Sequence, residues 1–220
     1  MLNIILTGST GMVGEGVLIE CLKSDMVNSV LVINRKSVSM QHKKLKEIIL
    51  SDFNNIYAVA EQLKGYNACL FCAGVSSVGK KEEEFYKLTY TLTLNFAQAV
   101  SMNPGITFCY ISGAGTDSSE KGRIMWARVK GKTENDLMKL PFAAVYNFRP
   151  GILKPTAGQK NVLNFYKYFS WLIPIVKLFS RNSISTLEQL GLAMIEVSAH
   201  GYSKNIIEIS DIHLLAERRK

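Results

Sequence analysis

The amino-acid sequence predicts an α/β fold: a doubly wound parallel sheet with helices on both faces and a small helical cover near the C-terminus. Apolar runs typical of buried strands alternate with helical patterns, which implies right-handed βαβ units. A glycine-rich turn joins the first strand to the first helix. The 220 residues, 47% of them hydrophobic, suffice to bury one good core. We therefore expect a single domain over 1–220, with 152–200 forming the cover.

The expected strands are apolar runs at 2–7, 29–34, 46–50, 68–73, 106–111 and 143–148. The expected helices lie between most of them, at 12–24, 55–63, 81–101 and 122–139. The link between the second and third strands reads RKSVSMQHKKLK and has no apolar helical period. We expect an irregular loop there.

The net charge of +8 is scattered along the chain, apart from HKK at 42–44 and the ending ERRK. Neither a zinc-finger spacing nor a basic heptad pattern accompanies it, so nucleic-acid binding is not expected. A basic surface also suits an anionic cofactor or substrate.

Four cysteines fit a reducing compartment. Cys69 and Cys72 form a CxxC, but residues three apart in a strand point to opposite faces, which favours two buried thiols over a redox or metal pair. No metal site is expected. The segment LNIILTG enters a strand pattern at once and lacks the features of a secretory signal, so the sequence predicts a cytoplasmic protein.

The first chemical motif is GSTGMVGEG at 8–16. Gly8 and Gly11 would let the backbone turn tightly and approach a pyrophosphate at the N-terminus of the following helix, and Gly14 would let that helix pack on the sheet. Because the triplet follows a strand and opens a βαβ unit, it predicts dinucleotide binding in a Rossmann fold rather than a merely structural turn.

The second strand ends in LVINRKS, where folds that prefer NAD usually carry Asp or Glu for the ribose 2′-hydroxyl. Here Asn34, Arg35 and Lys36 stand instead. Arg35 is suited to a 2′-phosphate, and that contact is worth on the order of 1.5–3 kcal/mol. The sequence therefore predicts NADP(H) rather than NAD(H); a solvated surface arginine is the alternative.

The order TGSTGMVG, INRK, LSDF, FCAG, YISGAG, WARVK, FRPGIL resembles the short-chain dehydrogenase/reductase superfamily. It is most similar to the extended or atypical branch, which includes nucleoside-diphosphate-sugar epimerases and Tat-interacting-protein-type oxidoreductases. The similarity covers residues 1 to about 155 and, less specifically, STLEQLGLAMIEV onward. With the motifs above, it implies cofactor contacts at Gly8, Thr10, Gly11, Met12, Val13, Gly14, Arg35, Lys36, Asp52, Phe53, Cys72, Ala73, Gly74, Lys130, Arg149, Pro150 and Gly151.

The same resemblance implies that Ser112 occupies the catalytic serine position and that Lys130 holds the nicotinamide ribose. Trp126 stands where the family has a catalytic tyrosine. Its indole N–H donates but neither accepts nor titrates usefully, so Trp126 cannot shuttle a proton. General acid–base catalysis contributes about 10²–10⁴-fold, so ordinary carbonyl reduction should be impaired unless another group substitutes.

Lys130 itself is one candidate substitute, if desolvation lowers its pKa. Tyr86 and Tyr90, four apart on the preceding long helix, are others, although packing against the sheet is the simpler interpretation of both. The three histidines, His42, His200 and His213, fall outside the predicted site.

The stretch VLNFYKYFSWLIPIVKLF at 162–179 is the most apolar and aromatic part of the chain. Lys167, Lys177 and Pro174 argue against a membrane span, and a helix pair covering the substrate side is favoured over a membrane-surface helix. An amphipathic helix follows, with Ser185 as its expected N-cap, Glu188 three residues on and Gly201 after its end.

Two functional classes remain open. One is an NADP(H)-dependent oxidoreductase or epimerase-like enzyme that acts on an unknown small carbonyl or hydroxyl substrate with a modified site. The other is a catalytically impaired NADP(H)-binding protein that signals redox state or steers a partner. A homodimer is the default expectation, and the fold alone does not separate these classes.

Overall fold

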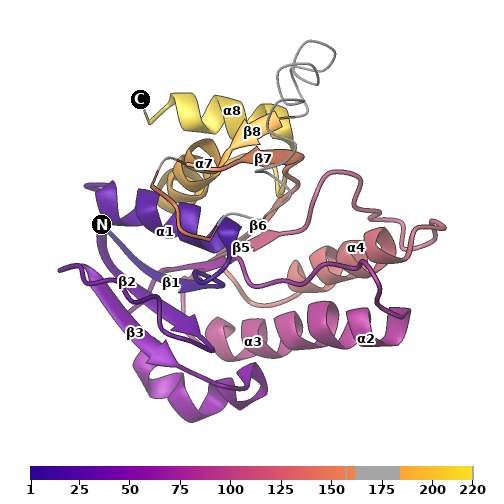
Figure 1. The fold of residues 1–220 in the computed structure, drawn as a ribbon, viewed down its shortest axis with the longest axis horizontal. Coiled ribbons are helices and arrows are strands. Elements are labelled where there is room, and N and C mark those ends of the chain that lie inside the picture. The colour runs from indigo at the N-terminus through magenta and orange to yellow at the C-terminus, as the bar shows by residue number, and fades with distance from the viewer. Residues whose placement is uncertain (157, 162–183, 220) are drawn as a thin grey trace.

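The computed structural model describes residues 1–156, 158–161 and 184–219. Its central element is a seven-stranded sheet in the order β3-β2-β1-β4-β5-β6-β9, in which every neighbouring pair is parallel (Figure 1). The strands are β1 (Leu2–Thr7), β2 (Val27–Asn34), β3 (Leu45–Ile49), β4 (Ala68–Phe71), β5 (Thr107–Ile111), β6 (Ala144–Phe148) and β9 (Ile206–Ile207). The predicted doubly wound parallel fold is confirmed.

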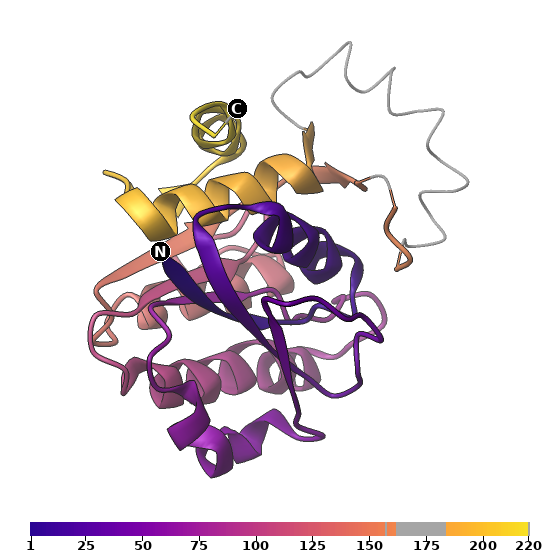
Figure 2. The ribbon, with the colours of Figure 1, turned by 90° about the vertical axis from the view of Figure 1, so that its left-hand side faces the viewer.

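Helices cover both faces of this sheet, as the two perpendicular views show (Figures 1 and 2). One face packs against α1 (Met12–Lys23) and α7 (Leu187–His200), with α8 (Ile209–Glu217) packed on α7. The other face packs against α3 (Leu92–Ser101), α4 (Met125–Leu137) and the 3₁₀ helix η1 (Phe53–Leu63). Because both faces are buried, the central strands are apolar on both sides.

Helices α1 and α7 approach each other through two glycines. A Cβ on Gly16 would lie 2.7 Å from Cβ of Leu187, and a Cβ on Gly191 would lie 2.9 Å from Cβ of Glu20. Helix α7, which falls within the predicted cover 152–200, thus forms part of the layer beside α1. The predicted cover as a whole stays a prediction, because 162–183 lie outside the described residues.

Most expected elements appear within a few residues of their predicted bounds. The link from Arg35 to Lys44 is the irregular loop that the sequence predicts. The long helix expected at 81–101 is present as α2 (Glu82–Tyr86) and α3, joined by the π-helical turn η2 (Lys87–Thr91). The sequence missed the two-stranded sheet of β7 (Ile152–Lys154) and β8 (Ile184–Thr186), the edge strand β9 and helix α8, because such short elements carry little periodicity.

The predicted N-cap of α7 is wrong by one residue. Thr186 caps the helix in a reciprocal box with Gln189, and Gly201 ends it with a φ of 71°. Ser185 belongs to β8, where its backbone pairs with Leu153 and its hydroxyl lies 3.2 Å from Nε2 of His213.

Cys69 and Cys72 face opposite sides of the sheet as predicted, since they pack in different core clusters. Burial raises the pKa of both thiols. In the part of the chain that the structure describes, no helix has the length and apolarity to span a bilayer, and no three metal-ligating side chains gather into a cluster. The apolar stretch 162–179 falls outside that part.

Candidate functional site

The glycine turn between β1 and α1 is built by contacts that exclude side chains. Gly8 has a φ of 72°, and a Cβ there would lie 2.6 Å from the backbone N of Ala73. A Cβ on Gly14 would lie 2.2 Å from the carbonyl oxygen of Gly8, so Gly14 lets α1 pack on the turn that precedes it. Gly11 N–H donates to the Gly8 carbonyl at 2.9 Å. The turn is therefore held close to both β4 and α1.

Gly11 is the N-cap of α1, and no side chain caps the helix there. The N–H groups of the first turn of a helix have no intrahelical partner, and together with the helix dipole they favour an anion. The carboxylate of Glu15 does not compete for them, because it accepts from the backbone N–H groups of Lys160 at 2.9 Å and Asn161 at 2.7 Å. The start of α1 is thus suited to a pyrophosphate.

Asn34, at the end of β2, is bound to this turn. Its Oδ1 accepts from Ser9 N–H at 3.2 Å, and its Nδ2 donates to Ser9 Oγ at 2.7 Å. Asn34 is 2% exposed. The position that would carry a ribose-binding carboxylate therefore holds an amide whose two polar atoms are both engaged by the turn.

Two adjoining cavities form a groove at the carboxyl edge of the sheet, and they share Arg35, Phe53, Ala73 and Gly74. The inner cavity, about 270 Å³, lies over the glycine turn and is lined by Gly8, Thr10, Gly11, Asn34, Arg35, Phe53, Cys72, Ala73 and Gly74. The outer cavity, also about 270 Å³, is lined by Arg35, Ser51, Asp52, Phe53, Asn54, Ala73, Gly74, Val75, Lys87, Leu88 and Leu92. Nine of the predicted cofactor residues line this groove.

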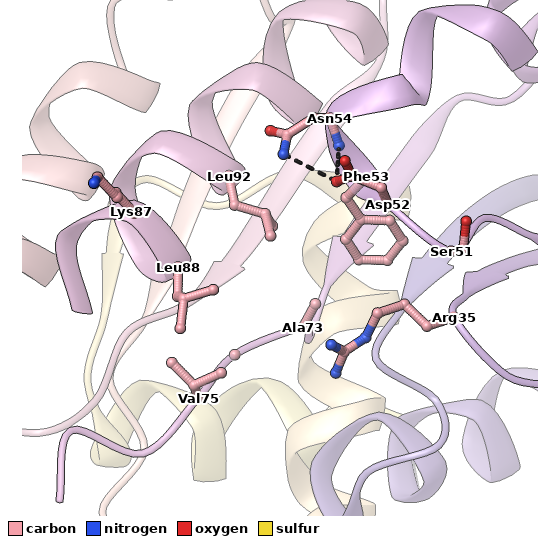
Figure 3. A pocket seen from close by; sticks show the side chains of 11 residues that line it. Arg35, Ser51, Asp52, Phe53, Asn54, Ala73, Val75, Lys87, Leu88 and Leu92 are labelled. Carbon is pink, nitrogen blue, oxygen red and sulfur yellow. Dashed lines mark hydrogen bonds between the residues drawn. The ribbon is translucent and has the colours of Figure 1, made fainter. Parts of the chain in front are cut away.

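Figure 3 shows how the outer cavity is arranged. Oδ1 of Asp52 accepts from both the backbone N–H and Nδ2 of Asn54 at 2.9 Å, which caps η1. The Phe53 ring and the apolar side chains of Leu88 and Leu92 lie around the space, and Arg35 extends its guanidinium toward Ala73. Within the described residues, Arg35 forms no ion pair. This cavity can bind a flat apolar base between Phe53 and the leucines. At its inner end the Arg35 guanidinium can bind an anionic group of the same ligand.

The predicted catalytic serine lies at the carboxyl end of β5, 5% exposed. Its hydroxyl oxygen lies 2.5 Å from Oε1 of Glu134 and 3.0 Å from the Phe148 carbonyl oxygen, so its single proton can be donated to either acceptor. Glu134 is fully buried on α4, and its carboxylate also accepts from Nε of Arg149 at 3.0 Å and from Nη2 at 2.5 Å. The Ser112 hydroxyl is therefore directed into a buried ion pair.

Arg149 follows β6 and reaches several elements. Besides Glu134, its guanidinium donates to Oγ of Ser118 at 2.5 Å and to Oε1 of Glu208 at 3.4 Å. The hydrogen bonds to the Glu134 carboxylate are the main reason that the pKa of Arg149 is raised. The structure thus places Arg149 as a link between β6, α4, α8 and the loop after β5. Its predicted contact with the cofactor stays a prediction.

Lys130 and Trp126 lie one turn apart on α4. The Lys130 ammonium donates to the backbone carbonyl of Ser112 and, at 3.5 Å, to that of Ile111. Burial lowers the pKa of Lys130 to about 8, although the Glu134 carboxylate acts in the opposite direction. Trp126 is half-buried, and a Cβ on Gly115 would lie 3.7 Å from its ring. Ser112, Lys130 and Trp126 are thus brought to the same edge of the sheet.

Five other predicted cofactor residues lie at the edges of this region. Met12 and Val13 turn their side chains into or against the core, so only their backbones face the turn. Lys36 is exposed and does not line the groove. Pro150 accepts from Ala114 N–H at 2.9 Å, and Gly151 leads into β7.

Sequence reasoning missed Glu134 and the outer-cavity residues Val75, Lys87, Leu88 and Leu92. One signal for Glu134 was available: it lies four residues after Lys130 and eight after Trp126, so all three share one helix face. A carboxylate on that face suggests a partner cation, but the sequence does not show that Arg149 supplies it. The leucines carried no signal, because apolar residues on a helix most often pack in a core.

Curated relatives resemble more than two thirds of the chain. Protein FMP52-2, mitochondrial, from Scheffersomyces stipitis is 30% identical over 152 residues, which cover 67% of this chain and 65% of that protein. Protein fmp52, mitochondrial, from Emericella nidulans is 27% identical over 166 residues, which cover 73% of this chain and 69% of that protein. The match therefore leaves about a third of each relative unaccounted for.

These names contradict the prediction of a cytoplasmic protein, because the relatives are called mitochondrial. The sequence observations behind that prediction were free cysteines and the missing features of a secretory signal. Cysteines that fit a reducing compartment do not separate one such compartment from another, and an N-terminal pattern does not decide the compartment.

Solved structures share the fold across nearly the whole chain. The dTDP-glucose 4,6-dehydratase DesIV from Streptomyces venezuelae, solved with NAD bound, superposes with a TM-score of 0.66 at 14% identity, covering 98% of this chain and 80% of that one. The ADP-L-glycero-D-manno-heptose-6-epimerase of Helicobacter pylori gives a TM-score of 0.69 at 15% identity, covering 98% and 81%. Both are dehydratases or epimerases of the extended superfamily that the sequence resembles.

The model of the NAD dependent epimerase/dehydratase family matches residues 4–122, which include the glycine turn, the end of β2 and the carboxyl ends of β4 and β5. The match spans more than half of the chain and contains the whole groove. With this fold and this turn, the chain belongs to the NAD dependent epimerase/dehydratase family.

Proposed function

We propose that the protein binds NADP(H) in the groove and is an oxidoreductase or epimerase-like enzyme acting on a small carbonyl or hydroxyl substrate. Membership of the family and the NAD-bound neighbours support a nicotinamide cofactor. The observation that carries the preference for NADP(H) is the pairing at the end of β2: Asn34 in place of a carboxylate, followed by Arg35 within the groove.

The residues present fit this cofactor. The first turn of α1 offers N–H groups for the pyrophosphate, and the outer cavity between Phe53 and the leucines has the shape and polarity for adenine. The Arg35 guanidinium lies between the two, where the 2′-phosphate of the adenosine ribose would be held. Lys130 would hold the nicotinamide ribose from the end of β5. When bound, the cofactor would supply or accept the hydride.

Calorimetric titration with NADPH and NADH tests this proposal. Arg35→Ala should weaken NADPH binding by about 10- to 100-fold, which corresponds to the loss of about 1.5–3 kcal/mol of charge-assisted contact, and should leave NADH binding nearly unchanged. Lys36→Ala is the matched control, because Lys36 is equally basic and adjacent but lies outside the groove. Equal losses of NADPH affinity in both variants would show that the general positive charge of this region, and not a specific contact of Arg35, favours NADPH.

A second candidate is a catalytically impaired NADP(H)-binding protein that reports redox state or steers a partner. Two observations favour it: Trp126 provides no transferable proton, and the Ser112 hydroxyl is directed toward Glu134 rather than left free for a substrate. The two candidates separate on turnover. NADPH binding with no oxidation of NADPH by a broad panel of aldehydes, ketones and nucleotide sugars would favour the second.

A further inference from the structure

The site has no tyrosine at the position where the resemblance places the proton donor, so any reduction needs another source of protons. Trp126, Lys130 and Glu134 follow each other at intervals of four on α4 and share the face that meets the end of β5. The question is which group near Ser112 can release a proton.

Tyr86 and Tyr90 are excluded by their direction. The Tyr90 hydroxyl donates to Oδ2 of Asp136 at 2.7 Å, and Lys132 Nζ lies 5.0 Å from the Tyr90 ring centroid. The rings of Tyr86 and Tyr90 pack 4.6 Å apart. Positions 132 and 136 are two residues beyond 130 and 134, about 200° around the helix, so these tyrosines lie on a different face of α4.

The histidines are also distant from the site. His42 Nδ1 accepts from Lys44 N–H in the loop after β2, His200 contacts Glu196 on α7, and His213 contacts Ser185 and Ile184. Tyr110 on β5 is buried in the core and its hydroxyl is hydrogen-bonded to Thr133, and the hydroxyl of Ser112 is directed to Glu134 and the Phe148 carbonyl. Among the described residues considered above, Lys130 is the titratable group whose proton-bearing atom lies at the end of β5 and is not held by a carboxylate.

We infer that Lys130 is the proton donor of the reaction, supplying through Nζ the proton that tyrosine supplies in the superfamily. The inference rests on the proposed function. An ammonium has three N–H donors, and the carbonyls of Ser112 and Ile111 engage two of them. The bond to Ile111 is 3.5 Å long and can be exchanged for the nicotinamide ribose, which leaves the third N–H for a substrate oxygen at the carboxyl end of β5, one helix turn from Trp126.

The charges around Lys130 suit this role. Burial lowers its pKa to about 8, so that near neutral pH the group is mostly protonated and yet gives up its proton more readily than an ordinary lysine. Glu134, on the same helix, is the carboxylate that opposes this shift, and Arg149 from β6 forms an ion pair with it. The pairing limits how strongly Glu134 can hold the proton on Lys130.

In the direction of reduction, hydride from NADPH reaches the carbonyl carbon and the C=O π bond breaks. The oxygen takes a proton from Nζ of Lys130, and the neutral amine recovers a proton from solvent. NADPH is oxidised to NADP⁺, and the carbonyl compound is reduced to an alcohol. Oxidation runs the same steps in reverse, with the neutral amine accepting the hydroxyl proton.

The experiment uses the full chain with NADPH and 4-nitrobenzaldehyde as the probe. NADPH binding is measured first by its fluorescence, and kcat/KM is then measured from pH 6 to 10 for the wild type, Lys130→Arg and Lys132→Arg. We expect an inflection near pH 8 in the wild type. In Lys130→Arg, whose guanidinium keeps the charge but does not release its proton, we expect a loss of about 100-fold or more with the inflection gone. Lys132→Arg, on the other face, should behave as the wild type.

A second readout is independent of turnover. Lysines dimethylated with a ¹³C label give one resonance each, and the one that disappears in Lys130→Arg should titrate near pH 8 in the cofactor-free protein.

Trp126→Tyr should raise turnover, because it restores a hydroxyl one helix turn from Lys130.

The outcomes separate the two proposals. Failure of the wild type to bind NADPH would overturn the proposed function and this inference with it. NADPH binding with activity that Lys130→Arg leaves intact would overturn this inference alone. So would a Lys130 resonance that titrates above pH 10, or NADPH binding without any reduction of the probe by the wild type.

Discussion

Asn34 and Ser9 hold each other by two hydrogen bonds, 3.2 Å and 2.7 Å long, across the ends of β2 and β1. This pair fixes the glycine turn to the neighbouring strand. Asn34 also occupies the position at which other folds of this kind carry the carboxylate that binds a ribose hydroxyl. The local geometry of the turn and the choice of cofactor are therefore coupled through one side chain.

Asn34→Asp tests that coupling. The Ser9 hydroxyl can donate to the new carboxylate, so the fold should survive, but the negative charge will repel a 2′-phosphate and can accept from a ribose hydroxyl. We expect the Kd for NADPH to rise about tenfold or more while that for NADH falls. Titration of both cofactors against wild type and variant measures the change; an unchanged ratio of the two Kd values would contradict the assignment of the 2′-phosphate to this end of the groove.

Two glycines of the turn should respond differently to alanine. A Cβ on Gly14 would lie 2.2 Å from the Gly8 carbonyl, whereas one on Gly11 meets only that carbonyl at 3.4 Å. Gly14→Ala should cost about 1–3 kcal/mol of stability or more, measured as a lower midpoint of urea unfolding. Gly11→Ala should fold normally but bind NADPH more weakly, because Gly11 lines the inner cavity. Equal stability of the two variants would argue against the turn described.

The buried ion pair of Glu134 and Arg149 predicts a large loss of stability. Glu134→Ala leaves the Arg149 guanidinium, whose side chain is 11% exposed, without its carboxylate, and breaking such a pair costs about 3–5 kcal/mol. Glu83→Ala is the control, because it removes an exposed i,i+4 pair with Lys87 and should change little. Chemical unfolding of both variants, compared with wild type, checks the contrast.

Asp136 predicts a dependence of stability on pH. Burial alone would raise its pKa, but hydrogen bonds from Lys139, Lys132 and Tyr90 outweigh this and hold the pKa well below the ordinary value. Because the folded-state pKa is the lower one, the stabilisation is fully present above the unfolded value of about 4 and is lost as the pH falls toward the folded value.

Asp136→Asn should therefore be less stable than the wild type at pH 7, with a difference that shrinks steadily below about pH 4. Thermal unfolding of both proteins between pH 2.5 and 7 follows the change. A difference that stays constant across this range would mean that lost packing, and not charge, causes the destabilisation.

Local sequence accounts for the parts of the site that it predicted. The glycine turn and Arg35 each lie within a few residues of a strand end, where the chemistry follows from neighbours in the chain. Glu134 was missed because its partners Ser112 and Arg149 come from two other elements. Hydrophobic periodicity within one segment does not indicate contacts between side chains of different segments. The bond of Asn34 to Ser9 was likewise invisible, since it joins two strand ends 25 residues apart.

The shortest elements were missed for a related reason. Strand β9 has two residues and joins the sheet only through its pairing with β6, and β7 and β8 are defined by each other. A run of two or three residues shows no alternation from which a strand can be inferred. These elements exist because of tertiary pairing and not because of their own propensity.

The close contact of α1 with α7 through Gly16 and Gly191 has a consequence for how the chain reaches its native state. The part of this sheet face that α1 does not cover stays exposed until residues about 170 positions later in the chain dock beside α1. Contacts of such high sequence separation slow folding and prolong the exposure of apolar surface. During synthesis, the cofactor-binding half should remain dependent on chaperones until α7 has emerged from the ribosome.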